Sequence, residues 1–598
     1  MSNPIISFQD FGFQYDAQAE PTLHHINLDI YPGEKVLIAG ASGSGKSTIG
    51  NCINGLIPFA YPGESTGKLL VDGKEAKQVG IFELSHTVGT VLQDTDGQFI
   101  GLNVAEDIAF ALENDCVPQE KLFDIVDEVA KLVGMQDFLE QEPHELSGGQ
   151  KQRVSLAGIL VDDVKVLLFD EPLANLDPAS GKHTIELIDE VQKRTGAAVI
   201  IIEHRVEDVL WKSVDRIVLM EEGKILTDMR PAEILAEDWL MPHGIREPLY
   251  LTALKYAGVG ITAEMKPEHQ DSLCLSTEQQ MQVRNWADVQ LEKYDVSAGN
   301  VAKSNPEMAN FKEASVEPVA KVPLLEVKNL CFSYDENRPI LQDVSFTIHK
   351  GEMVSIVGQN GAGKSTLAKL ICGFEQPADG RICFEGRDIA GDTIKERAAK
   401  IGYVMQNPNQ MLSKPMIWDE VELALMQTDM SAEERKQRVE ETLKVCGLYP
   451  FRKWPVSALS YGQKKRVTIA SILVQRPQLI ILDEPTAGQD YRHYTEIMEF
   501  LVELNKQGYA ILMITHDMHL MLEYTPRAIC FSSGKLLADN SAAYVLTHPE
   551  IVREANLKET SLYGLSLQCG VENPQTFVER FIEYEREMRA ERNGECCG

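Results

Sequence analysis

Short runs of apolar residues recur along the chain and lead into glycine-rich, acidic or histidine-containing segments. They lie at 36–39, 166–169 and 199–202 in the first half and at 354–357, 479–482 and 511–514 in the second half. Continuous apolar runs of this length are typical of strands in a parallel sheet that is buried on both faces. The pattern therefore predicts an α/β fold in each half of the chain.

The two halves repeat one another in order. The loop GASGSGKS at 40–47 returns as GQNGAGKS at 358–365, and later motifs return about 313 positions on. A period of this length indicates two homologous domains rather than a solenoid of short units. The first half carries five extra residues within 57–66, where Pro and Gly predict a surface loop.

The repeat also predicts the domain boundaries. YAGV at 256–259 matches QCGV at 568–571, so each domain includes a small C-terminal extension. Residues 263–321 have no counterpart, and their Ser, Pro and Glu content predicts a flexible linker. The expected division is a first domain at 1–262, the linker at 263–321, a second domain at 322–572 and a helical tail at 573–598.

Composition narrows the class of function. The net charge of −33 argues against a nucleic-acid partner, which needs a basic surface. The 11 cysteines form no Cys-x-x-Cys pair, so we expect reduced thiols rather than a metal cluster. No signal peptide is evident, and no apolar run approaches the roughly 18 residues of a membrane span. If the protein acts on a membrane, we expect another chain to cross it.

The glycine-rich loops carry the clearest chemistry. Glycines let backbone N–H groups wrap phosphates, and the helix that follows adds its positive N-terminal end. In this pattern Lys46 and Lys364 reach the β- and γ-phosphates, while Ser47 and Ser365 bind Mg²⁺. The expected nucleotide-binding residues are Gly40, Ser42, Gly43, Gly45, Lys46, Ser47 and Thr48, with Gly358, Asn360, Gly361, Gly363, Lys364, Ser365 and Thr366 in the second half.

Acid pairs and histidines follow later strands. Asp170-Glu171 and Asp483-Glu484 end apolar runs, where ligands bind in such sheets. We expect the Asp to hold Mg²⁺ and the Glu to polarise the attacking water, although a solvated acid pair is the alternative. His204 and His516 follow the next run and could contact the γ-phosphate, or serve structurally. Gln93 and Gln406 complete the expected Mg²⁺ set, which is Ser47, Gln93, Asp170, Ser365, Gln406 and Asp483.

With LSGGQ at 146–150 and LSYGQ at 459–463, the chain resembles the ATP-binding cassette (ABC) superfamily over nearly all its length outside the linker. The resemblance implies two tandem domains, each a P-loop α/β core with an antiparallel β subdomain and a helical signature subdomain. It also implies ATPase activity, with Glu171, Glu484, His204 and His516 as catalytic residues. Further nucleotide contacts are implied for Ser147, Gly148, Gly149 and Gln150, for Ser460, Gly462 and Gln463, and for Tyr15 and Tyr334 on adenine. For the two tyrosines, a core aromatic is the alternative.

In that superfamily the signature segment of one domain, here 146–150 or 459–463, covers the nucleotide held by the other domain. ATP at Lys46 would thus be closed by 460–463, and ATP at Lys364 by 147–150. Tyr461 stands where glycine is usual, which predicts an altered but working site at Lys46. The glutamates of the two acid pairs, Glu171 and Glu484, are the Walker B glutamates of this superfamily. Both are present, so neither site is expected to be inactive.

The segment after Gln93 narrows the resemblance. DTDGQFI at 94–100 and VAEDIAF at 104–110 are similar to the ATPases of energy-coupling factor transporters, which import vitamins and transition-metal ions. This implies a membrane scaffold subunit, a substrate-binding membrane subunit and a place at the cytoplasmic face of the membrane. We expect Asp419 and Glu420 to face basic helices of the scaffold, or simply to be solvated.

Two other classes share the motifs. A fused ATPase of a sugar or peptide importer would need different membrane subunits, and a ribosome-associated ABC protein would need a basic connector. The acidic chain disfavours the second class. The sequence does not identify the transported solute.

Overall fold

The computed structural model describes residues 3–93, 95–174, 176–304, 322–335, 338–426 and 428–592. The chain divides into two compact units, Met1–Gln279 with Asp490–Arg492, and Gln280–Gln489 with His493–Gly598. Each unit contains one repeat and is described by itself.

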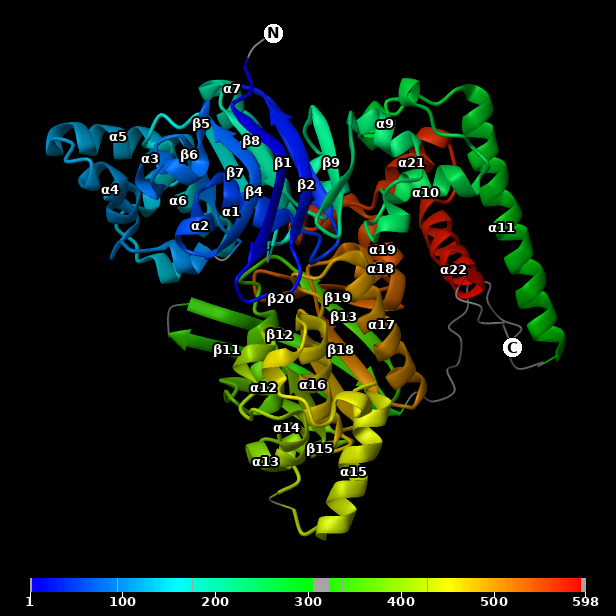
Figure 1. Ribbon diagram of the computed structural model, residues 1–598. Helices are drawn as coiled ribbons and strands as arrows, with labels where there is room; N and C mark the ends of the chain where they lie inside the picture. The colour runs from blue at the N-terminus through cyan, green and yellow to red at the C-terminus, as the bar shows by residue number, and fades with distance from the viewer. Residues whose placement is uncertain are drawn as a thin grey trace. The chain divides into compact units, whose positions relative to one another are not determined.

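The first repeat contains two sheets (Figure 1). A four-stranded antiparallel sheet has the order β2-β1-β4-β5, and a six-stranded sheet has the order β10-β9-β3-β8-β7-β6. The strands are β1 (Ile6–Tyr15), β2 (Leu23–Ile30), β3 (Lys35–Gly40), β4 (Gly63–Val71), β5 (Lys74–Glu75), β6 (Val88–Val91), β7 (Val166–Asp170), β8 (Ala198–Ile202), β9 (Arg216–Glu221) and β10 (Lys224–Met229).

Helices α3 to α6 gather at one side of this six-stranded sheet (Figure 1). The helices of the first repeat are α1 (Lys46–Ile53), α2 (Leu56–Phe59), α3 (Ile81–Ser85), α4 (Val104–Asn114), α5 (Gln119–Leu132), α6 (Gly148–Leu160), α7 (Pro178–Thr195), α8 (Val206–Val209), α9 (Pro231–Ala236) and α10 (Leu249–Tyr256). The surface loop predicted at 57–66 is wrong in part, because α2 and the start of β4 occupy most of it. Gly63 pairs there with Tyr15 of β1.

The second repeat has the same two sheets. Their orders are β12-β11-β14-β15 and β16-β17-β18-β13-β19-β20. The strands are β11 (Pro323–Asp335), β12 (Arg338–His349), β13 (Met353–Gly358), β14 (Asp379–Phe384), β15 (Arg387–Asp388), β16 (Ile401–Val404), β17 (Leu479–Asp483), β18 (Ala510–Ile514), β19 (Arg527–Ser532) and β20 (Lys535–Asn540). The helices are α12 (Lys364–Cys372), α13 (Ile394–Ala398), α14 (Ile417–Leu423), α15 (Ala432–Val445), α16 (Tyr461–Leu473), α17 (Tyr491–Lys506), α18 (Met518–Tyr524), α19 (Ala542–Leu546), α20 (Pro549–Glu554), α21 (Ser561–Cys569) and α22 (Pro574–Arg592).

The apolar runs form the predicted buried parallel strands. In the first repeat β3 pairs in parallel with β8, with Val36 beside Ile200. In the second repeat β13 pairs in parallel with β18, with Val354 beside Leu512. All four of these side chains are fully buried. The predicted α/β fold class, with an antiparallel sheet in addition to the six-stranded sheet of each repeat, is therefore confirmed.

The segment expected to be a flexible linker is ordered over its first part. Two short 3₁₀ turns at Ala263–Met265 and Gln270–Ser272 precede the helix α11 (Thr277–Ser304). Val283 and Ala287 of α11 are buried. The flexible-linker prediction is thus wrong for 263–304, because apolar residues at helical spacing give α11 a face to bury. Residues 305–321 lie outside the described residues.

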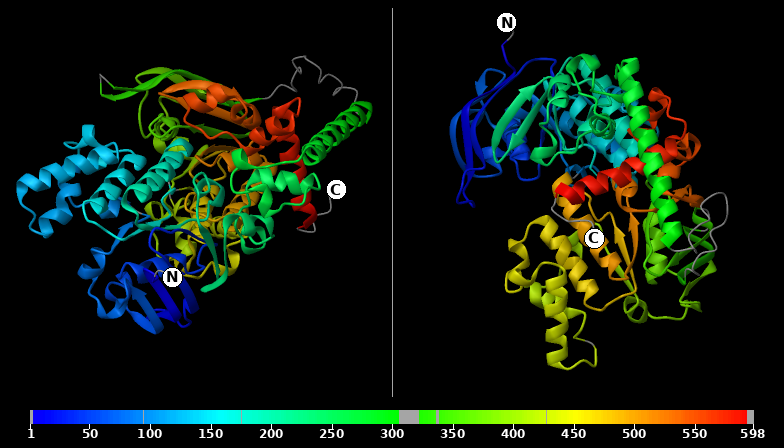
Figure 2. Two further views of the ribbon diagram at one scale, coloured as in Figure 1. Left: turned by 90° about the horizontal axis from the view of Figure 1, so that it is seen from above. Right: turned by 90° about the vertical axis from the view of Figure 1, so that its right-hand side faces the viewer.

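Helix α11 packs within the second unit against α21 and α22, and the three lie side by side in Figure 2. The Trp286 ring meets the edges of Phe577 and Tyr584 at 6.0 and 5.6 Å between ring centroids. The Arg284 guanidinium donates to the backbone carbonyl of Cys569 at 2.7 Å. The described helices include none that is both long and apolar enough to span a membrane.

Candidate nucleotide sites

Each glycine-rich loop joins the central strand of its six-stranded sheet to a helix. Gly45, at the N-cap of α1, has φ 96°, a left-handed conformation that favours glycine. The Lys46 Nζ donates to the carbonyls of Gly40 and Ala41, at 2.8 Å each. Both loops therefore hold a lysine folded against their own backbone, since Lys364 does the same in the second repeat, to Gly358 and Gln359 at 2.8 Å each.

Both loop lysines are almost completely buried. Burial lowers the pKa of Lys46, although the nearby Glu171 carboxylate opposes that effect. An ammonium group removed from water is a strong binder of phosphate oxygens. The remaining expected residues of the two loops, from Gly40 to Thr48 and from Gly358 to Thr366, lie on the same turns and the first turns of α1 and α12.

The candidate Mg²⁺ ligands of the first repeat meet at the carboxyl end of β7. The Ser47 hydroxyl donates to the Asp170 carboxylate at 3.3 Å. The Gln93 amide donates to the Glu171 carboxylate at 2.5 Å. A hydroxyl, an amide and two carboxylates from three segments supply the oxygen ligands that Mg²⁺ prefers. The residues present thus fit a bound Mg²⁺.

The two Walker B glutamates share an unusual backbone conformation. Glu171 has φ 48° and Glu484 has φ 47°. Their backbone N–H groups donate to the last residues of the neighbouring strands, Ile202 and Ile514, at 2.9 Å each. Such left-handed non-glycine residues cluster at functional sites, where surrounding structure holds them in place.

Burial also changes the chemistry of these two glutamates. It raises the pKa of Glu171, and the neighbouring carboxylates of Glu203 and Asp170 raise it further. Burial likewise raises the pKa of Glu484, with Asp483 adding to the effect. A carboxyl whose pKa approaches neutrality is suited to accepting a proton from water.

Each expected histidine lies beside its glutamate. The His516 Nε2 is 3.2 Å from Glu484 Oε1. The His204 Nδ1 is 3.9 Å from Glu171 Oε1 and 3.2 Å from Glu203 Oε1. Burial lowers the pKa of His204, which favours the neutral ring. The structure therefore places the loop lysine, the acid pair and the histidine of each repeat near one another.

The two signature segments begin helices α6 and α16. Ser147 caps α6 and Ser460 caps α16, and in both helices a glutamine three residues on completes a capping box. Tyr461, which replaces a glycine, is 40% exposed. The first-repeat Asp177 caps α7 by accepting from the Ser180 N–H at 2.9 Å.

The two expected adenine-stacking tyrosines differ in burial, and Tyr15 packs against the hydrophobic core of the first repeat. Tyr15 is partly buried, and its hydroxyl lies 3.2 Å from the Thr48 hydroxyl. Tyr334 is 54% exposed. Each lies edge-on to the phenylalanine two residues earlier, Phe13 or Phe332, at 4.8 Å between ring centroids. The same aromatic contact thus recurs in both repeats, and in the first repeat the tyrosine also reaches Thr48 of α1.

Sequence reasoning missed three residues near these sites, of which Glu203 and Lys465 are buried and Tyr403 is partly buried. Glu203 is fully buried before His204, where the second repeat has Thr515. The Tyr403 hydroxyl donates to Asp483 at 2.9 Å, where the first repeat has Thr90. Lys465, also fully buried, takes the place of Gln152. The differences between the two halves at these positions were the available signal.

The prediction that Glu420 faces a membrane scaffold is wrong. Its carboxylate is buried and accepts from the N–H groups of Ser413 and Lys414 at 2.8 and 2.6 Å. Asp107 does the same in the first repeat, accepting from Ile100 and Gly101. These acids close the turn before α4 or α14, because unpaired backbone donors there need acceptors. Asp419 is exposed, as expected.

Comparison with known proteins shows the family of the chain. A family model described as "ABC transporter" matches residues 23–174 and 341–487. A second model, described as "ATP-binding cassette cobalt transporter", matches residues 237–301. It covers most of α11, where the sequence predicted a flexible linker.

Full-length relatives carry the same description. A protein of Clostridium perfringens named "Putative ABC transporter ATP-binding protein" is 56% identical over 98% of this chain and 99% of its own. A protein of Enterococcus faecalis with that name is 55% identical over 98% of this chain and all of its own. A solved structure of cbiO1 from Clostridium perfringens, part of the ABC transporter complex cbiONQ, is 33% identical over 39% of this chain and 94% of its own, with a TM-score of 0.37.

Proposed function

The chain belongs to the ABC transporter family as an ATP-binding protein with ATPase activity, and we propose that it energises an importer of the energy-coupling factor type. The proposed cargo is a vitamin or a transition-metal ion. The observation that carries this proposal is the match of residues 237–301 to the model described as "ATP-binding cassette cobalt transporter". That segment lies beyond the nucleotide motifs, which importers of every cargo class share.

We assign ATP hydrolysis to both repeats. Lys46 and Lys364 would hold the β- and γ-phosphates, with Ser47, Gln93 and Asp170, or Ser365, Gln406 and Asp483, around Mg²⁺. The ion would neutralise charge that develops on the phosphate oxygens. Glu171 and Glu484 would position the attacking water and accept its proton as the bond to the β-phosphate oxygen breaks. Their raised pKa values suit that task.

The partly buried histidines would orient these glutamates. His516 approaches Glu484, and His204 approaches both Glu171 and Glu203. Both histidines lie just after the strand that carries the backbone partner of the glutamate. A side chain at this position can contact both the catalytic carboxylate and a γ-phosphate. This assignment rests on the short distance between each imidazole and its carboxylate. A neutral imidazole can donate a hydrogen bond from one ring nitrogen and accept one at the other.

We further propose that the two repeats pair head to tail, so that the signature of each closes on the nucleotide of the other. Fusion in one chain would give that pairing a high effective concentration. ATP binding would close the pair, and hydrolysis would reopen it. The domain boundaries are proposed as 1–262 and 322–572, with α11 forming part of the connection.

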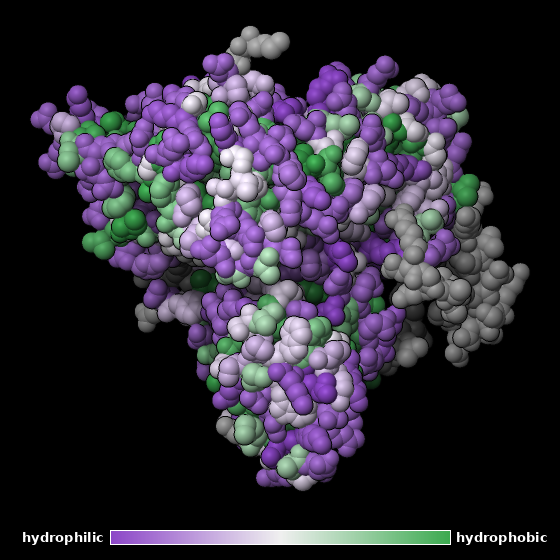
Figure 3. All heavy atoms as spheres, in the orientation of Figure 1, coloured by the Kyte–Doolittle hydropathy of each residue, from purple (hydrophilic) through white to green (hydrophobic). Residues whose placement is uncertain are grey.

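Membrane partners would contact the helical part of each repeat. In the first repeat Ile100, Leu102, Phe110 and Phe123 are 64%, 79%, 39% and 62% exposed. Green surface appears among purple over α4 and α5 in Figure 3. Exposed apolar side chains in this number mark an interaction surface. We propose that this surface receives a transmembrane scaffold subunit at the cytoplasmic face of the membrane, beside a substrate-binding membrane subunit.

Reconstitution tests the proposal. The chain, a scaffold subunit and a substrate-binding subunit would be placed in vesicles with ATP and Mg²⁺, and uptake of labelled Co²⁺, Ni²⁺ or vitamins measured. We expect uptake that requires ATP and that is lost in the Glu171→Gln, Glu484→Gln double variant. Uptake of a sugar or peptide instead, or stable association with ribosomes, would overturn it.

A further inference from the structure

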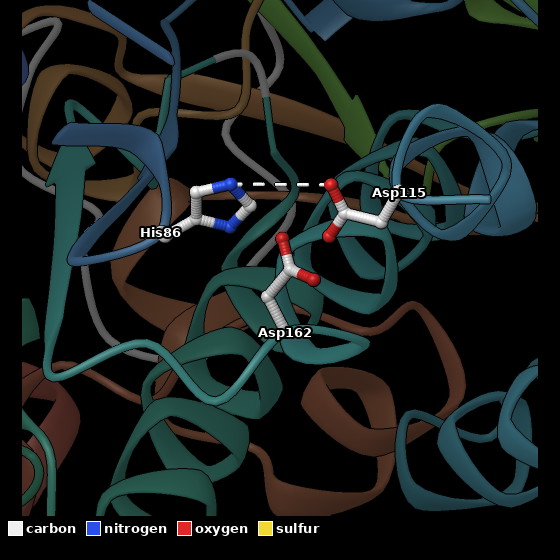
Figure 4. Close-up of side chains that lie close together, drawn as sticks. All are labelled: His86, Asp115 and Asp162. Carbon is white, nitrogen blue, oxygen red and sulfur yellow. Dashed lines mark ion pairs between the residues drawn. The ribbon is translucent and has the colours of Figure 1, made fainter. Parts of the chain in front are cut away.

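Three potential metal ligands meet in the first repeat, away from the nucleotide loop (Figure 4). His86, Asp115 and Asp162 each offer one ligand atom, and these atoms lie within 4.8 Å of one another. The His86 Nε2 is 3.9 Å from Asp115 Oδ1. The three side chains point toward a common centre from three different segments of the chain.

Each of the three residues follows the end of a helix. His86 is the C-cap of α3, Asp115 is the C-cap of α4, and Asp162 comes two residues after α6. Helix C-termini carry partial negative charge from their unpaired carbonyls. The two longer helices, α4 and α6, therefore add to the negative potential of the two carboxylates.

Nothing else in the described chain compensates this charge. Neither Asp115 nor Asp162 has a lysine or arginine ion-pair partner among the described residues, and His86 is the only basic side chain paired with Asp115 there. Neither carboxylate accepts a hydrogen bond within the described part of the chain. Partial burial raises the pKa of Asp162, and the Asp115 carboxylate raises it further. The His86 imidazole opposes that effect, and it is the one basic side chain at this cluster among the described residues.

The second repeat shows that the fold does not require these residues. The corresponding positions are Ala399, Thr428 and Gln475, at or after the ends of the corresponding helices α13, α14 and α16. None of the three is a carboxylate or an imidazole. The same architecture therefore forms without the cluster, which removes helix capping as its explanation.

We propose that His86, Asp115 and Asp162 bind a divalent first-row transition-metal ion. One imidazole nitrogen and two carboxylate oxygens suit Zn²⁺, Co²⁺, Ni²⁺ or Mn²⁺, whereas Ca²⁺ and Mg²⁺ favour oxygen ligands alone. Metal–ligand bonds of about 2.0–2.2 Å bring ligand atoms to about 3.0–3.5 Å apart. Small side-chain rotations supply the remaining approach, since both His86 and Asp115 are partly exposed. Solvent completes the coordination on the open side.

Such an ion would join three segments of the first repeat. His86 lies two residues before β6, the edge strand of the six-stranded sheet, whereas Asp115 and Asp162 end α4 and α6. The ion would therefore tie the helical part of the repeat to the edge of its sheet. The second repeat would have no such link. This proposal does not depend on the cargo of the transporter.

Co²⁺ is the probe that tests the site, because its visible absorption reports coordination. The full chain would be titrated with CoCl₂ in excess Mg²⁺ and without nucleotide, by calorimetry and absorption, and then with ZnCl₂ as competitor. We expect one Co²⁺ per chain, displaced by Zn²⁺. His86→Ala and Asp162→Asn should each weaken binding at least about tenfold.

Two variants serve as matched controls. Asp163→Asn removes the adjacent exposed acid, and His183→Ala removes an exposed histidine that also lies near one carboxylate, Glu186 at 3.8 Å. Both should bind Co²⁺ within about twofold of the original chain. Thermal unfolding in the presence of a chelator would confirm that each variant is folded. If His86→Ala does not fold, His86→Gln would replace it. Absence of stoichiometric binding, or equal binding by the His86 and Asp162 variants, would overturn the proposal.

Discussion

The hydroxyl of Tyr461 donates to the backbone carbonyl of Gln406 at 3.4 Å. Lys465, one turn further along α16, donates to the same carbonyl at 2.7 Å and to Met405 at 2.9 Å. The start of α16, which carries the second signature segment, is thus hydrogen-bonded to the loop that contains Gln406 in the same repeat. In the first repeat Gly148 has no side chain, and Gln152 donates to Pro172 instead. The two repeats therefore differ in how signature and glutamine loop are connected.

Replacing Lys465 should destabilise the second repeat. Lys465→Met removes one ammonium group that makes two hydrogen bonds. The Met405 carbonyl loses its Lys465 donor, whereas the Gln406 carbonyl keeps the contact from the Tyr461 hydroxyl. We expect a loss of about 1–3 kcal/mol, the usual cost of an unpaired buried polar group. Thermal unfolding would measure it, with Lys464→Met, at the partly exposed neighbouring position, as control. Equal stability of the two variants would contradict the inference.

The catalytic assignment of the Walker B glutamates can be separated from nucleotide binding. The Glu171→Gln, Glu484→Gln double variant keeps the shape of both side chains but removes the proton acceptors. We expect ATP affinity to be kept and steady-state hydrolysis to fall at least about a hundredfold. Nucleotide binding by fluorescence and phosphate release would be measured in the same sample. Near-normal hydrolysis would show that other groups activate the water.

The two glutamates should not contribute equally. Tyr461 lies in the signature that, in the proposed head-to-tail pair, closes the site at Lys46. Its bulk and its contact with Gln406 should slow that site relative to the one at Lys364. Glu484→Gln should therefore lower ATPase activity more than Glu171→Gln. Equal losses, or the reverse order, would argue against the asymmetry, and Tyr461→Gly should reduce the difference.

The first repeat has a buried ion pair at two positions where the second repeat has apolar residues. The Lys35 Nζ is 2.5 Å from Asp189 Oδ1, and the two side chains are 4% and 8% exposed. Met353 and Val502 hold the corresponding positions in the second repeat. Asp189→Val alone should cost about 3–5 kcal/mol, because it leaves the Lys35 ammonium buried without its partner, and the Lys35→Met, Asp189→Val double variant should cost less. Lys35→Met alone should cost less than Asp189→Val, because Asp189 keeps its ion pair with Lys193. Additive losses in thermal unfolding would refute this coupling.

The same pair has a defined pH dependence. Burial alone would raise the pKa of Asp189, but hydrogen bonds from Lys193 and Lys35 hold it below its ordinary value. The stabilisation is therefore complete above the unfolded pKa of about 3.9 and is lost as the pH falls through the folded pKa. At neutral pH the pair is fully formed, so the free energies of unfolding of the single and double variants are best compared there.

The strands and nucleotide loops were predictable because their residues have few alternatives. A continuous apolar run such as 199–202 needs burial on both faces, and the glycines of 40–45 serve a backbone that must turn closely. Helix α11 was harder to predict from the sequence, because its polar composition hides the helical spacing of Val283 and Ala287. The role of Glu420 was hidden for a different reason. An acid in a charged segment resembles a solvated one until the backbone donors of Ser413 and Lys414 are placed around it.

The burial of Glu420 sharpens the test of the membrane contact. Asp419→Lys changes an exposed charge on α14, whereas Glu420→Lys would disrupt the turn before that helix. An exposed ion pair with a scaffold helix contributes about 0–1 kcal/mol, and a desolvated one more. We therefore expect Asp419→Lys to weaken co-purification with the scaffold several-fold while ATP affinity and thermal unfolding stay unchanged. Asp429→Lys, beyond the end of α14, is the matched control. Undiminished docking by Asp419→Lys would leave the apolar side chains Leu423 and Met426, which are 37% and 61% exposed, as the main contact.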